Sequence, residues 1–311
     1  MIRIRPSIVA FALITACVGI VVVLYGWRWN QSSRLAELAA RMPVNDHILL
    51  YIDTAALRQA GVLEVLMGPE AEESPEYREF VRRSGFNYRS DMDAVLAAFG
   101  QDASLFLVRG RFRWGQLYEY AEERGAGCEN GFCVVAGGVP ERRISFFAVT
   151  PGILAMASSR DRGAARRLAA GGGGLNVASL PAEPVWLMMS GREIQRASWL
   201  PTGMRPMASA LAEAEQIVLA IGPGEGQDFE ARATVQCATT EAAETVATRM
   251  RGVTELLASL IRREGKEPNP ADLSGVLSSG AFDREDMRVR GRWRIRRELV
   301  DSLASGTASG G

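Results

Sequence analysis

The sequence predicts an α+β fold, in which an N-terminal transmembrane helix precedes two related modules of mostly antiparallel sheet with helices on one face. Three observations indicate it. Residues 7–27 form an apolar run without charges. Strand-like and helix-like patterns alternate from residue 47 to residue 304. A glycine run at 171–174 divides that stretch into two halves of similar order.

The apolar run at 7–27 predicts an uncleaved single-pass anchor. It has about 20 residues, the length of a helix that spans a bilayer core. Arg3 and Arg5 precede the run, Trp27 ends it and Trp29 follows it, both tryptophans at the depth of the membrane interface. We expect residues 1–6 in the cytoplasm, the anchor in the inner (cytoplasmic) membrane in contact with its lipid bilayer, and the C-terminal bulk outside the cytoplasm.

Cys17 belongs to the segment ITAC, which resembles a bacterial lipoprotein processing box. Lipidation of Cys17 is therefore an alternative to the simple anchor, and cleavage with secretion is another. Apolar residues continue past Cys17, where a lipoprotein normally turns polar. The uncleaved anchor is the interpretation that we prefer.

Two cysteines flank the strongest turn signal of the chain. Asn130-Gly131 is typical of a two-residue type I′ hairpin loop, because both residues tolerate positive φ. Such a loop places Cys128 opposite Cys133, within the distance that a disulfide bridges. A zinc site, a redox pair and two free thiols are the alternatives. A disulfide persists in oxidising compartments, so the pair agrees with an extracytoplasmic ectodomain.

Patterning along the chain predicts seven segments. They are the cytoplasmic N-terminus 1–6, the anchor 7–27, a stalk 28–46, the first module 47–170, a linker 171–181, the second module 182–304 and a disordered tail 305–311. Strand patterns occur in HILLYI, ASLFLVRGRFRW, RISFFAVTPGILAMASS, EPVWLMM, QIVLAIG, FEARATVQC and SGVLSSGAFDREDMRVRGRWRI. Helix patterns occur in SSRLAELAARMP, SPEYREFVRRSGF, DMDAVLAAFG, GQLYEYAEERG, RDRGAARRLAA, MRPMASALAEAEQ, the 240–265 segment and RRELVDSLA.

One internal similarity supports two modules. VRGRFRW at 108–114 and VRGRWRI at 289–295 match in five of seven positions. If both are strands, alternate arginines share one solvated face of each sheet and apolar residues share the other. Solvation explains such a face, and contact with anions is the sharper hypothesis. The candidate anion contacts are Arg109, Arg111, Arg113, Arg290, Arg292 and Arg294.

Recognisable catalytic machinery is sparse. His47 is the single histidine, no serine lies in G-x-S-x-G, and the glycine runs lack the residues of a phosphate-binding loop. We therefore expect no cofactor, no metal and no enzymatic activity. The 36 basic and 36 acidic residues balance, so we expect no nucleic-acid partner.

HILLYIDTAAL after the anchor and RGRFRWGQLYEYA resemble a loose class of uncharacterised single-span, membrane-anchored bacterial exported proteins. The resemblance implies an anchored envelope protein and brings no catalytic residues. We expect a binding or scaffolding protein whose partner is an envelope protein or glycan. The alternatives are an envelope hydrolase with carboxylates in the cleft between the modules, and a binder of anionic lipid or glycan through the arginine-lined faces.

Overall fold

The computed structural model describes residues 34–43, 47–63, 74–139, 141–169, 175–196, 205–211, 213–226, 228–263, 265, 267–269 and 272–304. The predicted anchor 7–27, Cys17 and the tail 305–311 lie outside these ranges. Within them, no helix has the length and apolar character needed to cross a bilayer.

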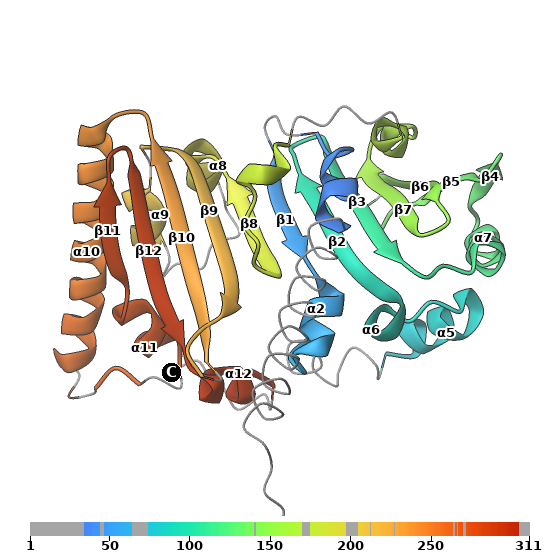
Figure 1. Cartoon of the computed structure of the whole chain (residues 1–311). Helices are drawn as coiled ribbons and strands as arrows, with labels where there is room; N and C mark the ends of the chain where they lie inside the picture. The colour runs from blue at the N-terminus through green and yellow to red at the C-terminus, as the bar shows by residue number, and fades with distance from the viewer. Residues whose placement is uncertain are drawn as a thin grey trace, which may run out of the picture.

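The strands form one twelve-stranded sheet in which each pairing is antiparallel (Figure 1). Its order is β11-β12-β10-β9-β8-β1-β2-β3-β7-β6-β5-β4. The strands are β1 (Ile48–Ile52), β2 (Met92–Phe99), β3 (Ala103–Gly110), β4 (Gly127–Glu129), β5 (Phe132–Ala136), β6 (Arg143–Thr150), β7 (Ile153–Ser159), β8 (Val185–Met189), β9 (Ala214–Pro223), β10 (Phe229–Cys237), β11 (Ala281–Glu285) and β12 (Arg288–Ile295).

Helices connect these strands. They are α2 (Thr54–Gln59), α5 (Pro75–Ser84), α6 (Tyr88–Asp91), α7 (Trp114–Glu123), α8 (Gly191–Arg196), α9 (Arg205–Ala210), α10 (Thr240–Arg263), α11 (Leu273–Ser278) and α12 (Arg297–Ala304), with 3₁₀ turns η1 (Ala164–Leu168) and η2 (Val177–Ser179). Residues 34–39 are helical as well. Ser74 caps α5 through its side chain, and Gly85 ends that helix at φ 64°.

The two halves of the sheet share one strand order. The first reads β1-β2-β3-β7-β6 and the second reads β8-β9-β10-β12-β11, with the β4–β5 hairpin added to the first. The similarity between 108–114 and 289–295 does not follow this correspondence, because it aligns β3 with β12 instead of β7 with β12. In addition, residues 108–114 combine the end of β3 with the loop that follows it, because β3 ends at Gly110, whereas residues 289–295 all lie in β12.

The two faces of the sheet are covered differently along its length. We call face A the face that carries Leu107 of β3, and face B the face that carries Ile217 of β9. In the first half, residues 34–39 and η1 bury face A, and α7 packs on face B. In the second half, α8, α9 and α10 bury face B. The predicted arrangement, with helices on one face of the sheet, therefore holds for the second half, whereas the first half is covered on both faces.

The segment DMDAVLAAFG was predicted as a helix, and this prediction is wrong, because residues 92–99 form β2. The strand lies between β1 and β3 in the middle of the sheet. Ala94 and Leu96 are fully buried on face A, while Ala97 is 2% exposed on face B. A strand buried on both faces shows no polar alternation, so its apolar residues also fit a helical spacing.

Two further short segments form elements of another type than predicted. RDRGAARRLAA forms the five-residue 3₁₀ turn η1 instead of an α-helix. SGVLSS, expected as strand, forms helix α11, which begins at the side-chain cap of Asp272. Both elements are too short for a periodic pattern to define them, and their packing on neighbouring elements decides their geometry.

Candidate functional site

The predicted cysteine hairpin is confirmed. Cys128 of β4 lies opposite Cys133 of β5 and forms a disulfide with it, with 4.1 Å between the Cα atoms. Asn130 and Gly131 turn the chain with positive φ values of 51° and 76°. Cys133 is buried with Ala121 and Phe146 under α7. The bond therefore fastens β4, the edge strand, to the rest of the sheet.

The arginines of β12 alternate as predicted. Val289 and Trp293 are buried on face B, so Arg290, Arg292 and Arg294 point out from face A. Each of these arginine side chains is more than half exposed and has a carboxylate partner on the same surface. These pairs are Arg290–Glu285 at 2.7 Å, Arg292–Asp283 at 3.1 Å and Arg294–Asp228 at 2.7 Å.

The other three candidate arginines do not share a strand face. Arg109 ends the regular part of β3 and pairs with Glu37 of the 34–39 helix. The backbone N–H of Arg111 donates to the carbonyl of Asp91 at 2.8 Å, which turns the chain out of the sheet after Gly110. Arg113 is exposed at the N-terminal end of α7. The strand prediction for Arg111 and Arg113 is therefore wrong.

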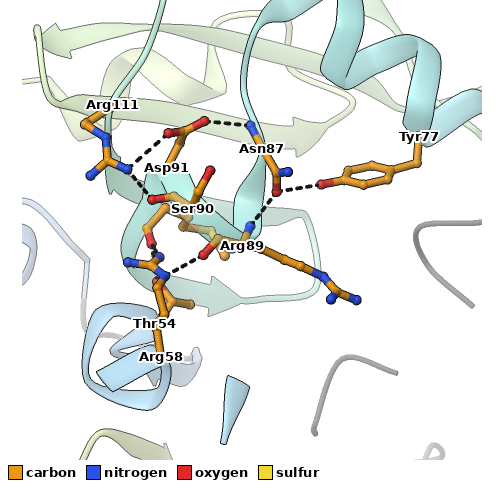
Figure 2. Close-up of polar contacts among 9 residues, drawn as sticks. Thr54, Arg58, Tyr77, Asn87, Arg89, Ser90, Asp91 and Arg111 are labelled. Atoms are coloured by element: carbon orange, nitrogen blue, oxygen red, sulfur yellow. Dashed lines mark hydrogen bonds and ion pairs between the residues drawn. The ribbon is translucent and has the colours of Figure 1, made fainter. Parts of the chain in front are cut away.

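Arg111 belongs to a polar cluster where α2, α6 and the start of β2 meet (Figure 2). Its guanidinium donates to the carboxylate of Asp91 at 3.1 Å and to the carbonyl of Ser90. The same Asp91 accepts from the backbone N–H of Asn87 at 2.9 Å. Thr54 Oγ1 donates to the carbonyl of Met92 at 2.7 Å. These donors and acceptors fix loops, so we assign a structural role to the cluster.

A buried carboxylate lies where the two halves of the sheet meet. Asp53 is fully buried and is the only acid in the described part of the chain with that property. It caps α2 by accepting from Ala56 N at 2.8 Å, and it pairs with Arg34 at 3.4 Å. Burial raises the pKa of Asp53 above its ordinary value, while Ala56 and Arg34 lower it. Tyr51 Oη donates to the same carboxylate at 3.5 Å.

This geometry bears on the alternative of a hydrolase with carboxylates between the modules. The halves are joined by continuous strand pairing between β1 and β8. The contacts of Asp53 are an ion pair, a helix cap and a tyrosine, which are structural contacts. Within the described ranges, no group of three or more His, Cys, Asp or Glu side chains is arranged to hold a metal ion.

One concave site was missed by the sequence analysis. It lies between η1 and the β4–β5 hairpin, has a volume of about 540 Å³, and is lined by three arginines, Arg143, Arg162 and Arg166. The segment RDRGAARR contains two of them, but their convergence with Arg143 depends on the β6–β7 hairpin. Local sequence patterns carry no signal for that convergence.

We predict that Arg34→Met destabilises the protein by about 3–5 kcal/mol at neutral pH, because it leaves the Asp53 carboxylate buried without its cation. Burial raises the pKa of Asp53, so acid neutralises this carboxyl in the folded protein. Loss of Arg34 raises the pKa of Asp53 further, so the deficit of the variant is complete above the pKa that Asp53 has in the variant and shrinks as the pH falls from there toward the wild-type pKa. Denaturant unfolding of the full-length chain across this pH range measures it.

Arg109→Met is the matched control, since its pair with Glu37 is partly exposed. We expect a loss below about 1 kcal/mol and no comparable pH dependence. Equal losses for both variants, or a deficit of Arg34→Met that grows in acid, would contradict the assignment of Asp53.

We predict that replacing Cys128 and Cys133 by serine lowers the free energy of unfolding by about 2 kcal/mol, the loop-closure value for so short a loop.

In intact cells, a chain with Cys17 and Cys237 replaced by alanine should react with a thiol reagent after denaturation only if it is first reduced. Labelling without reduction would show free thiols and remove the argument for an oxidising compartment.

No protein-family profile matches the chain, and no curated protein matches it in sequence. Among solved structures, crystal form I of TP0453 aligns with 88% of this chain and 98% of that chain, at 12% identity and a TM-score of 0.48. Crystal form III of TP0453 covers 86% and 97% respectively, at 11% identity and a TM-score of 0.45. These similarities assign neither a family nor a function to the chain.

Proposed function

We propose that the chain is a non-catalytic binding or scaffolding protein of the bacterial cell envelope. In this proposal residues 7–27 hold it in the inner membrane, the bulk of the chain is extracytoplasmic, and face A of the second half binds a protein partner. The observation that carries the proposal is the open, charged surface formed on face A by β10, β12 and β11. We call it the charged sheet surface.

In the described part of the chain, the face A residues of β10, β12 and β11 are mostly exposed, although the same face of the first half is buried. Thr234 of β10 is exposed on it, with Arg290 opposite on β12. On the other side of Thr234 lies Val218 of β9, which is partly buried against the face A core and marks the border of the surface. A solvated face is common in antiparallel sheets. Here the contrast between the two halves of one sheet supports a surface kept open for a partner.

The charges on this surface favour a protein partner over a polyanion. Arginines and acids alternate on it, as in the pairs Arg290–Glu285 and Arg292–Asp283. Arg232 adds two further ion pairs, one with Glu230 at 2.5 Å and one with Glu183 at 2.8 Å. The acids would repel a lipid or glycan surface of uniform negative charge. A protein surface with both signs of charge complements such a pattern.

The ion pairs of the surface can be exchanged at low cost. Exposed pairs contribute about 0–1 kcal/mol each, so a partner that offers new carboxylates or guanidinium groups replaces them without a large penalty. The Cys128–Cys133 disulfide supports the compartment, because such bonds persist outside the cytoplasm. The proposed partner is therefore a folded envelope protein.

We predict that a photo-crosslinking residue at Thr234 captures discrete partner species in intact cells. The matched control is the same residue at Glu255, which is exposed on α10 on the opposite side of the sheet. A second substitution, Arg292→Glu, should reduce the Thr234 product about tenfold, because it places two acids side by side.

The crosslinked products from the two positions decide whether the proposal holds. Products specific to Thr234 and sensitive to Arg292→Glu support the proposal. Identical products from Thr234 and Glu255, or no product from Thr234, would contradict it. Products that Arg292→Glu leaves unchanged would exclude a role for the alternating charges.

A further inference from the structure

We propose that the concave site between η1 and the β4–β5 hairpin binds an amphipathic anion, a molecule with a phosphate or carboxylate group on an apolar body. We call it the arginine pocket. It lies at the other end of the sheet from the charged sheet surface, so this inference does not depend on the proposed partner.

The floor of the arginine pocket is apolar. Cys133 points to face B, so its neighbours Phe132 and Val134 point to face A. Phe132 and Val134 line the site together with Ala136 of the same strand. Gly127 of β4 lies opposite Val134 and adds no side chain to the floor. The hairpin thus extends the sheet beside η1. The concave site is the hollow between η1 and the hairpin.

The wall and rim of the pocket are cationic. Arg143 comes from the start of β6, Arg162 from the turn after β7, and Arg166 from η1. The guanidinium of Arg166 lies over the ring of Phe132, 4.3 Å from its centroid, which orients it against the floor. Glu129 is the one acid among the lining residues.

The three arginines of the pocket differ from two neighbouring arginines in their pairing. Within the described ranges, none of them has a carboxylate partner, whereas Arg160 and Arg167 nearby do. The neighbouring concave site differs, because its lining has three acids, Asp102, Glu141 and Asp161, beside three arginines. There Arg160 pairs with Glu141 at 2.5 Å and Arg167 with Asp161 at 3.3 Å. The arginine pocket therefore has an uncompensated positive charge.

The chemistry of the lining selects the ligand class. Guanidinium groups bind phosphate and carboxylate oxygens with paired hydrogen bonds. The side chains of Val134 and Ala136, beside the Phe132 ring that Arg166 covers, favour an apolar group next to that anion. A bare inorganic anion would leave this floor uncovered. An apolar body with a single anionic group satisfies both parts of the site.

The disulfide supports this pocket from the other face. β4 has three residues and is paired on one side only, at the edge of the sheet. Cys128 and Cys133 hold it on β5, so that Gly127 and Glu129 stay in the pocket wall. Reduction of the bond should therefore weaken ligand binding about tenfold while the distant charged sheet surface is unaffected.

Titration calorimetry on the full-length chain in nonionic detergent tests the proposal, with phenyl phosphate, benzoate, inorganic phosphate and phenol as probes. We expect phenyl phosphate or benzoate to bind at least about tenfold more tightly than inorganic phosphate and phenol. Comparison of the first two distinguishes a phosphate from a carboxylate ligand. Arg166→Ala and Arg162→Ala should each weaken that binding about tenfold.

Arg292→Ala is the matched control, since it removes a paired arginine from the far half of the sheet. It should leave the affinity unchanged. Absence of binding by both aromatic anions would overturn the proposal. So would equal affinity for inorganic phosphate and phenyl phosphate, or an equal loss in Arg166→Ala and Arg292→Ala. Arg162 and Arg166 are exposed, so circular dichroism should show that both variants keep the fold.

Discussion

The pairing of β1 with β8 is the interaction on which the rest of the structure depends. These two strands come from different halves of the chain, and their antiparallel register sets Tyr51 opposite Trp186. Both side chains are buried, and their rings stack with centroids 5.5 Å apart. The N–H of Asp53 donates to the carbonyl of Pro184 at 2.7 Å and closes the junction. The two halves are therefore one sheet and share two faces.

This junction decides where each hydrophobic core lies. Trp186 and Met188 of β8 belong to the core under residues 34–39, on face A. Met189 and the partly buried Leu187 of the same strand contribute to the core under α10, on face B. One strand thus serves two cores through the alternation of its side chains. The next strand, β9, still contributes Ala220 and the partly buried Val218 to the face A core, and the charged sheet surface begins at β10.

Local patterns predicted the parts of the fold that local chemistry determines. Asn130-Gly131 defined its turn and hence the disulfide, and the alternation in β12 defined the exposed arginines. The helix at 34–39, α5, α7 and α10 also lie where their patterns indicated. In each case neighbouring residues carry the physical signal. The sheet order and the shared faces needed long-range pairing that no local pattern contains.

Local patterns mispredict the segments in which tertiary contacts override local preference. β2 reads as a helix because both of its faces are buried. Arg111 reads as part of a strand, but its backbone bond to Asp91 ends β3. The arginine pocket needs Arg143 and Arg166, which two strands separate in the chain. The candidate sites therefore depend on the order of the strands in the sheet, and the β1–β8 junction joins the two halves of that order.

Native-state hydrogen exchange of the full-length chain tests that junction most directly. If β1–β8 pairing makes one cooperative sheet, the amides of both strands exchange only through global opening, and both halves lose protection at the same denaturant concentration. The account would be contradicted if the β8 amides exchanged early and the second half opened while β1, β2 and β3 stayed protected.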